Sequence, residues 1–218
     1  MRVSIVIFLW AIGLLTPALA NPVEKTAERP LSKVIITYSS ISGNMAPLWV
    51  TNEKGFFSKY GLNVQLVLVE GGSRAAQTLA SGDVAFAQMT GAGVIQSNLK
   101  GADIVMIAGI LNTMNYQFIV DKSVQRPDQL KGKALAVSRY GSSSDFAIRF
   151  ALDRYGLVPD KDVKILEIGT QPDRFAALET GKVQGVMLEV PQSLHAKTKG
   201  FRVLANLKML GLEYQHTG

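Results

Sequence analysis

Residues 34–88 read VIITYSSISGNMAPLWVTNEKGFFSKYGLNVQLVLVEGGSRAAQTLASGDVAFAQ, and this stretch decides the fold. Its apolar runs predict three strands, at Val34–Tyr38, Val64–Val69 and Val84–Gln88. The segments between the runs predict two helices, at Met45–Lys54 and Ser73–Ala80. Short strands that alternate with helices indicate βαβ units in a parallel sheet.

Small polar residues follow each of these strands. They are the loop Ser39–Asn44, the pair Gly71–Gly72 and the segment Met89–Gly93, which contains Thr90 and Gly91. In an open parallel sheet, ligands bind beyond the carboxyl ends of the strands. These ends offer hydroxyls, an amide and backbone N–H groups, but no Cys, no His and no pair of close carboxylates. The pattern therefore favours ligand binding over catalysis.

The same alternation continues to the end of the chain. A helix at Gly91–Lys100, a strand at Ile104–Ile110 and a polar loop at Asn112–Asn115 precede a short strand at Tyr116–Val120. The charged segment 121–133 then breaks the rhythm and predicts a crossing between domains. Beyond it we expect strands at Ala134–Ser138, Val163–Ile168, Val183–Leu188 and Phe201–Leu207, with helices at Ser142–Tyr155, Asp173–Thr180 and Pro191–Lys199.

The predicted fold class is α/β, with two lobes of mainly parallel sheets joined by a hinge. We expect lobe 1 at residues 33–120 and lobe 2 at 121–206, with 207–218 starting a return to lobe 1. A two-lobed chain of this pattern would return to complete its first sheet, so we expect the C-terminal part of lobe 1 to be missing.

The first residues predict export. Arg2, the apolar run Val3–Leu15 and the small residues Ala18–Ala20 are typical of a signal peptide cleaved after Ala20, at residues 1–20; an uncleaved membrane anchor is the alternative. Residues 21–32 read as a flexible tether. Without Cys the chain can form no disulfide and carries no lipid-attachment residue, which fits a soluble periplasmic protein. Basic residues are scattered, so no nucleic-acid partner is expected.

Several short motifs resemble one family. They are Ala46–Val50 (APLWV), Glu53–Phe57 (EKGFF), Tyr60–Val64 (YGLNV), Gly71–Ser73 (GGS), Leu79–Val84 (LASGDV) and Leu130–Lys133 (LKGK). Their order and spacing resemble SsuA/THI5-like solute-binding proteins over residues 33–207. These are periplasmic receptors of ATP-binding-cassette (ABC) importers for nitrate, sulfonates, taurine and thiamine precursors.

The resemblance implies a type II periplasmic-binding fold that closes on a small-molecule ligand. It also implies a membrane permease as partner, a monomer and no cofactor. The expected ligand is a small organic anion, a zwitterion or an amino-substituted heterocycle. One branch of the family contains thiamine-pyrimidine-precursor synthases with a Cys-rich motif, which this sequence lacks. A ligand-sensing domain of a signalling system is the other alternative.

The strongest candidate site is segment 139–145, which follows a strand and opens a helix. Backbone N–H groups and the helix dipole favour an anion there, and Arg139 adds charge. One serine could instead be an N-cap. Glu189 would repel a bare anion and accept from an amine or a protonated ring. The candidate ligand-binding residues are Ser40, Gly43, Asn44, Gly71, Gly72, Thr90, Gly91, Asn112, Arg139, Ser142, Ser143, Ser144 and Glu189.

Aromatic and histidine residues give weaker signals. Tyr38, Tyr116 or Tyr140 could provide an aromatic wall for a ring-shaped ligand. Neither His195 nor His216 has metal-ligand spacing to another His, Asp or Glu, so no metal site is expected.

Overall fold

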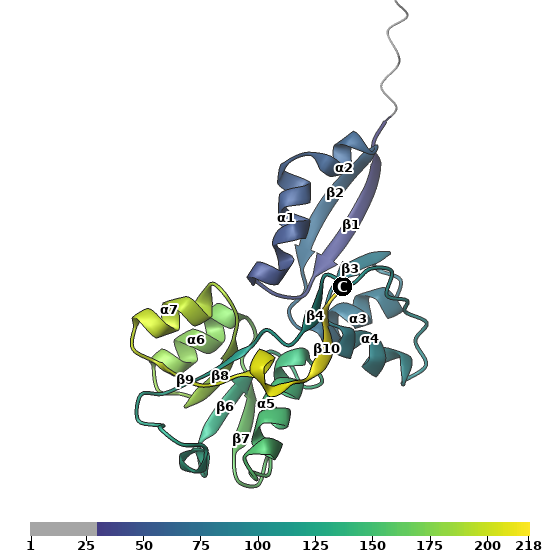
Figure 1. The fold of residues 1–218 in the computed structure, drawn as a ribbon. Coiled ribbons are helices and arrows are strands. Elements are labelled where there is room, and N and C mark those ends of the chain that lie inside the picture. The colour runs from purple at the N-terminus through teal and green to yellow at the C-terminus, as the bar shows by residue number, and fades with distance from the viewer. Residues whose placement is uncertain (1–29) are drawn as a thin grey trace, which may run out of the picture. The chain divides into compact units, whose positions relative to one another are not determined.

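The computed structural model describes residues 30–218, which form the helices and strands of Figure 1. The predicted signal peptide, its cleavage site and most of the predicted tether lie outside these residues. Within residues 30–218, no helix has both the length and the apolar character needed to cross a bilayer.

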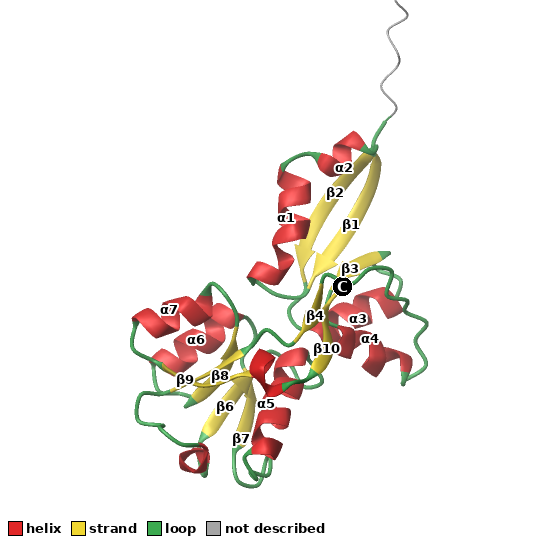
Figure 2. Cartoon of the chain, in the orientation of Figure 1, coloured by secondary structure: helices red, strands yellow, loops and turns green. Residues whose placement is uncertain are grey.

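The first sheet is parallel and has the strand order β2-β1-β3. Its strands are β1 (Ser32–Tyr38), β2 (Leu62–Leu68) and β3 (Phe86–Gln88). The accompanying helices are η1 (Gly43–Met45), α1 (Ala46–Glu53), α2 (Phe56–Lys59), α3 (Gly72–Ala80) and α4 (Gly91–Asn98). The βαβ prediction for residues 34–88 is therefore confirmed, with boundaries that shift by one or two residues at most ends (Figure 2).

Helices α3 and α4 pack closely because glycine lies at their contact. A Cβ atom on Gly93 would stand 2.4 Å from the Gly72 carbonyl oxygen and 2.6 Å from the Met89 methyl carbon. Ala75 and Ala76 of α3 are fully buried beside Met89. Small residues thus let α4 fix the position of Gly72, where α3 begins.

The predicted strand at 104–110 is wrong. Residues 102–109 have no regular secondary structure, and β4 (Leu111–Thr113) starts where a polar loop was expected. A strand needs a partner for its backbone groups, and β4 finds one in β10 (Glu213–Thr217). The segment before β4 has only its last residue, Ile110, paired in this way, through Ile110 N–H to the Thr217 carbonyl at 2.8 Å.

The second sheet has the order β7-β6-β8-β5-β9. Its strands are β5 (Gln117–Val120), β6 (Ala134–Val137), β7 (Lys164–Glu167), β8 (Gly185–Leu188) and β9 (Arg202–Asn206). The helices are η2 (Pro127–Leu130), α5 (Ser143–Arg154), α6 (Gln171–Glu179), α7 (Gln192–Thr198) and η3 (Leu207–Leu210). β6 runs parallel to β7 and β8, as predicted, whereas β5 runs antiparallel to β8 and β9.

The position of β5 corrects the expected crossing at 121–133. β5 already belongs to the second sheet, so the chain passes between the sheets before Gln117. Phe118, Ile119 and Val120 are fully buried there, because β8 and β9 flank the strand on both sides. Three consecutive buried apolar residues are typical of a central strand with both faces covered.

β10 brings the end of the described chain back to the first sheet. Met89 N–H donates to the Gly218 carbonyl at 2.9 Å, and Gly218 N–H donates to the Met89 carbonyl at 3.0 Å. The paired strands β4 and β10 therefore run side by side between the two sheets (Figure 1). This arrangement places His216 and Thr217 next to the loop that follows β3.

Candidate functional site

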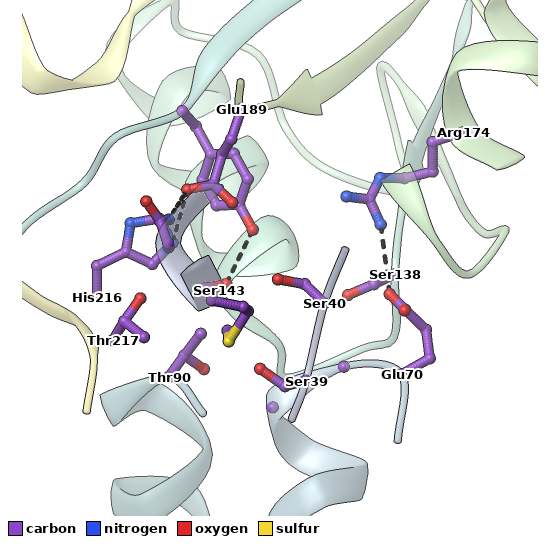
Figure 3. A pocket seen from close by; sticks show the side chains of 15 residues that line it. Ser39, Ser40, Glu70, Thr90, Ser138, Ser143, Arg174, Glu189, His216 and Thr217 are labelled. Carbon is purple, nitrogen blue, oxygen red and sulfur yellow. Dashed lines mark hydrogen bonds and ion pairs between the residues drawn. The ribbon is translucent and has the colours of Figure 1, made fainter. Parts of the chain in front are cut away.

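A small polar cavity lies where loops from both sheets meet. Its lining comes from the loops after β1, β2, β3, β6 and β8, from the start of α5, from α6 and from β10 (Figure 3). The lining residues are Ser39, Ser40, Asn44, Met45, Glu70, Gly71, Gly72, Thr90, Tyr116, Ser138, Ser143, Arg174, Glu189, His216 and Thr217. The cavity volume is about 10 Å³, which suffices for about one water molecule.

Glu189 is the most completely bonded charged residue of the cavity. Its side chain is 3% exposed, although it follows a strand end. Gln171 donates from Nε2 to Glu189 Oε2 at 2.8 Å and accepts from the Glu189 backbone N–H at 2.7 Å. Asn44 Nδ2 donates to Oε1, and His216 Nε2 stands 3.5 Å from the same oxygen. Donors from two distant segments therefore hold this carboxylate, and His216 from a third segment lies beside it.

The hydrogen bonds of His216 define its tautomer. The Asn115 backbone N–H donates to His216 Nδ1 at 3.2 Å, so Nδ1 must carry a lone pair. His216 Nε2 lies 3.5 Å from Glu189 Oε1. The side chains that donate hydrogen bonds to the Glu189 carboxylate, Asn44 and Gln171, are both uncharged.

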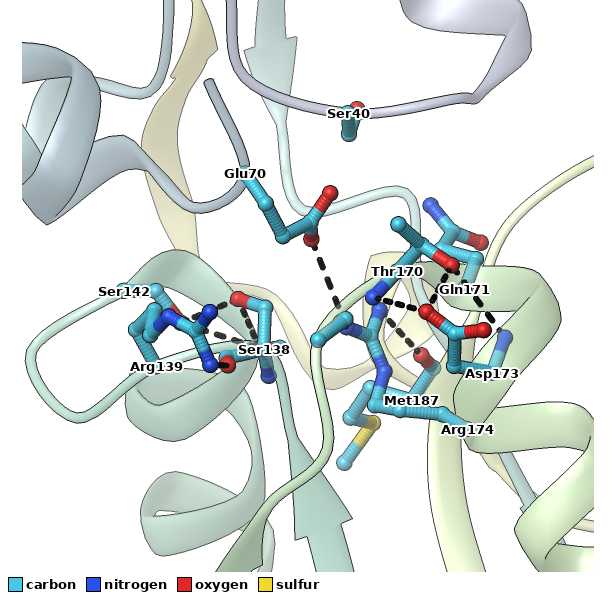
Figure 4. Close-up of polar contacts among 12 residues, drawn as sticks. Ser40, Glu70, Ser138, Arg139, Ser142, Thr170, Gln171, Asp173, Arg174 and Met187 are labelled. Atoms are coloured by element: carbon cyan, nitrogen blue, oxygen red, sulfur yellow. Dashed lines mark hydrogen bonds and ion pairs between the residues drawn. The ribbon is translucent and has the colours of Figure 1, made fainter. Parts of the chain in front are cut away.

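Arg174 and Glu70 form a second, looser charged group (Figure 4). Arg174 Nη1 lies 3.9 Å from Glu70 Oε1, which is too long for a hydrogen bond. Arg174 is 1% exposed and donates to the backbone carbonyls of Gly169 and Met187. Burial raises the pKa of the Glu70 carboxyl above its ordinary value, and Arg174 only partly offsets this. Burial also lowers the pKa of Arg174.

The serines at the start of α5 mostly bond to one another. The hydroxyls of Ser138, Ser142 and Ser144 form a closed triangle with edges of 2.9, 3.0 and 2.9 Å. Ser142 Oγ also accepts from the Asp145 backbone N–H at 3.4 Å and so caps the helix. The hydroxyls of Ser142 and Ser144, two of the three predicted serines, are therefore already bonded within the helix start, and Ser142 acts as the N-cap.

Ser143 is the serine that reaches the cavity. Its hydroxyl lies 3.1 Å from the hydroxyl of Tyr116, which is buried beneath it. Burial and the nearby Glu189 raise the pKa of Tyr116, so the phenol keeps its proton. The pair offers a ligand hydroxyl oxygens and no charge.

The structure places the predicted site residues in two groups. Those that line the cavity are Ser40, Asn44, Gly71, Gly72, Thr90, Ser143 and Glu189. Those outside the lining are Gly43, Gly91, Asn112, Arg139, Ser142 and Ser144. Tyr116 lines the cavity, whereas Tyr140 is 52% exposed and Tyr38 packs edge-on against Trp49.

The lining residues that were not predicted include Met45, Ser138, Arg174, His216 and Thr217. Ser138 directly follows β6 and could have been found from the rule of strand ends. Arg174 reads in the sequence as a charged residue on a surface helix, yet it occupies the first turn of α6 beyond a strand end. His216 and Thr217 reach the cavity through the β4–β10 pair, for which the sequence carries no local signal.

The charge balance of the lining bears on the ligand. Two carboxylates, Glu70 and Glu189, share the cavity with one guanidinium, Arg174. A bare inorganic anion would meet more negative than positive charge there. A ligand that presents N–H groups to Glu189 would instead find a strong acceptor.

Comparisons with known proteins agree with this architecture. The family model for NMT1/THI5-like proteins matches residues 42–215. The putative binding protein YtlA of Bacillus subtilis (strain 168) is 27% identical over 177 residues, which cover 79% of this chain and 53% of that protein. The chain thus spans about half the length of this curated relative.

Solved structures share the fold. The alkanesulfonate-binding protein SsuA from Xanthomonas axonopodis pv. citri, bound to MOPS, matches with a TM-score of 0.72 at 19% identity, over 87% of this chain and 65% of that one. The periplasmic nitrate-binding protein NrtA from Synechocystis PCC 6803 matches with a TM-score of 0.68 at 17% identity, over 86% and 54%. The predicted two-lobed periplasmic-binding fold is therefore confirmed.

Proposed function

Because this chain belongs to the NMT1/THI5-like family of solute-binding proteins, we propose that it is the substrate-binding component of an ABC importer. In this role it captures a small organic molecule in the periplasm and delivers it to a membrane permease. The names of similar proteins support the proposal, since they include a periplasmic nitrate-binding protein and a ligand-binding component of an ABC-type import system.

One observation carries the ligand class: Glu189 is a buried carboxylate in the cavity, and the hydrogen bonds that hold it come from uncharged donors. A buried charge without a cationic partner is costly, and a ligand that brings a cation removes that cost. We therefore propose a ligand with a protonated amine or an amino-substituted ring, bound through its N–H groups to Glu189. Asn44 is the donor that such a group would replace.

The chemistry of the cavity favours binding over catalysis. The Ser143 hydroxyl faces Tyr116 rather than His216, and the raised pKa of Tyr116 prevents this phenol from acting as a base near neutral pH. His216 is oriented by Asn115 and faces a carboxylate rather than a nucleophile. The lining therefore supplies hydrogen-bonding groups without an activated nucleophile.

Capture requires the two lobes to separate, because a cavity of about 10 Å³ admits no organic molecule. The contact of Asn44 with Glu189 must open, and that of Gly43 N–H with the Val190 carbonyl, at 2.9 Å, must open and re-form. A hinge between rigid lobes permits this motion. The ligand stabilises the closed form because only there does it touch both lobes.

A thermal-shift screen tests the ligand class. We expect amines and amino-substituted heterocycles to stabilise the chain, by about 2.7 kcal/mol at one hundred times the dissociation constant. Nitrate and simple sulfonates without an amino group should give smaller shifts. Glu189→Gln should abolish the shift with the best compound, whereas the exposed control Glu53→Gln should retain it. The proposal fails if nitrate or an amine-free sulfonate binds best, or if Glu189→Gln binds as tightly as the wild type.

Gene order and cell fractionation test the role in transport. We expect genes for an ATPase and a permease beside the gene for this chain, and the chain itself in the periplasmic fraction. A sensor kinase gene in their place would favour the signalling alternative.

A further inference from the structure

Arg174 is a buried cation whose donors are only partly used. A guanidinium has five N–H donors, and those of Arg174 make hydrogen bonds to two backbone carbonyls, of Gly169 and Met187. Its Nε has no hydrogen-bond partner among the described residues, although the residue is 1% exposed. Unused donors on a buried charge are costly, so this position favours an additional acceptor.

Glu70 does not act as that additional acceptor for Arg174. Its Oε1 stays 3.9 Å from Arg174 Nη1, and its Oε2 has no partner among residues 30–218. A charged pair that is buried and yet not in hydrogen-bond contact gains little from its attraction while both groups lose their water. The raised pKa of Glu70 reflects the same imbalance, because burial outweighs the attraction of Arg174.

The two charged groups lie on opposite sides of the cavity. Figure 3 shows Glu189 with His216 on one side and Arg174 with Glu70 on the other. The labelled hydroxyls of Ser39, Ser40, Ser138 and Ser143 lie between them. One end of the cavity therefore contains a hydrogen-bond acceptor, Glu189, and the other contains a strong donor, Arg174. Uncharged hydroxyl oxygens lie between them.

From this layout we propose that Arg174 is an anion-binding residue and that the ligand is bipolar, with an acidic group at Arg174 and a cationic group at Glu189. The inference rests on the proposed function and narrows its ligand class to amino acids and related zwitterions. Glu70 occupies the anion position only loosely, so an incoming carboxylate or sulfonate replaces it and pairs with the planar guanidinium. Glu70 thereby acts as an internal competitor of the ligand's acidic group.

Binding of matched probes tests the inference. The zwitterions are a graded series from glycine through β-alanine to aminovalerate, together with taurine. The amine-only analogues are propylamine and ethylamine, and the acid-only analogues are propionate and ethanesulfonate. Calorimetric titration should show at least one zwitterion binding about ten- to a hundredfold more tightly than its amine-only analogue, as expected for a charge-assisted hydrogen bond.

Two variants separate anion binding from a structural role. Arg174→Gln should weaken zwitterion binding and remove its advantage over the amine-only analogue. If this buried variant does not fold, Glu70→Gln still provides a test, because it leaves the carbonyl contacts of Arg174 in place. We expect Glu70→Gln to tighten zwitterion binding relative to amine-only binding, with Glu53→Gln as the surface control.

The outcomes distinguish the inference from the proposed function. If amine-only and zwitterionic probes bind equally well and both depend on Glu189, the function stands and the role of Arg174 is refuted. If Glu70→Gln changes the two classes of probe alike, the Glu70–Arg174 pair is structural and the inference also fails. If no amine-bearing probe binds at millimolar concentration, the ligand class and the inference are both wrong.

Discussion

Replacing Gly93 with alanine tests whether the packing of α3 on α4 sets the floor of the cavity. The new Cβ would lie 2.4 Å from the Gly72 carbonyl oxygen, about 1 Å inside an ordinary contact distance. The obstructing atom belongs to the backbone, so a rotamer change cannot relieve the clash. The helices must separate, and the packing of Ala75, Ala76 and Met89 must loosen with them.

Overpacking of this kind costs about 1–3 kcal/mol. For a chain of this size, that lowers Tm by about 2–12 °C. Because Gly71 and Gly72 line the cavity, ligand affinity should fall together with stability. Thermal unfolding followed by circular dichroism measures the first effect, and calorimetric titration with the best amine from the screen measures the second.

Gly43→Ala is the matched control. Its Cβ would lie 3.5 Å from the Val190 carbonyl oxygen, an ordinary contact, and Gly43 does not have a positive φ. We expect a change within about 1 kcal/mol, with any gain coming from lower entropy of the unfolded chain. The packing argument is refuted if Gly93→Ala is as stable as the wild type, or if both variants lose the same stability.

Three further variants probe other parts of the structure. Glu70→Gln should raise Tm at pH 8, because the raised pKa of Glu70 means that its charged form destabilises the folded state. The gain should vanish below pH 4.5, the ordinary pKa, where the wild-type carboxyl is protonated in both the folded and the unfolded state. A Tm difference that does not depend on pH would contradict this. Thr170→Ala removes the cap that accepts from the Asp173 backbone N–H at 3.2 Å and should cost about 0.5–2 kcal/mol in urea unfolding, with a null result showing that α6 needs no cap. Phe118→Ala, at a fully buried position of the second sheet, should cost about 3–5 kcal/mol, and a loss below 1 kcal/mol would contradict the assigned core.

Local pattern was sufficient to predict most strands and helices. The run Val34–Tyr38 is mostly apolar, rich in β-branched residues and followed by a polar loop, so burial and propensity indicate the same structure. Pro172 and Asp173 likewise indicated a helix start, which lies at Gln171, two residues before the predicted one. Agreement between local signals made these elements predictable.

Elements whose state depends on a distant partner were not predictable. Segment 104–110 has the composition of a strand, but strand formation needs a paired neighbour, and only its last residue is paired in this way. β5 could be identified as a strand, yet its sheet could not be assigned, because its partners β8 and β9 come more than sixty residues later. Pairing of this range leaves no periodic trace in the sequence.

The same distinction applies to the site. Residues in the segments that follow strands, such as Asn44, Thr90 and Glu189, could be chosen from topology alone, and they line the cavity. His216 lies there because β10 pairs with β4 across more than ninety residues of chain. The serines at 142 and 144 were chosen for their hydroxyls, but those hydroxyls satisfy one another. A sequence shows which polar groups are present but not which of them are already used.

Two contacts between the lobes end on main-chain oxygens, with Gly43 N–H donating to Val190 and Ser73 Oγ to Tyr140 at 3.2 Å. Carbonyl acceptors are common to all twenty amino acids, so this part of the contact tolerates change in the residues proposed to bind the ligand. Substitutions at Asn44, Glu70 or Glu189 could therefore alter selectivity while leaving these clasps intact. For anyone building a biosensor on this scaffold, recognition and shape change are separable parts that can be redesigned one at a time.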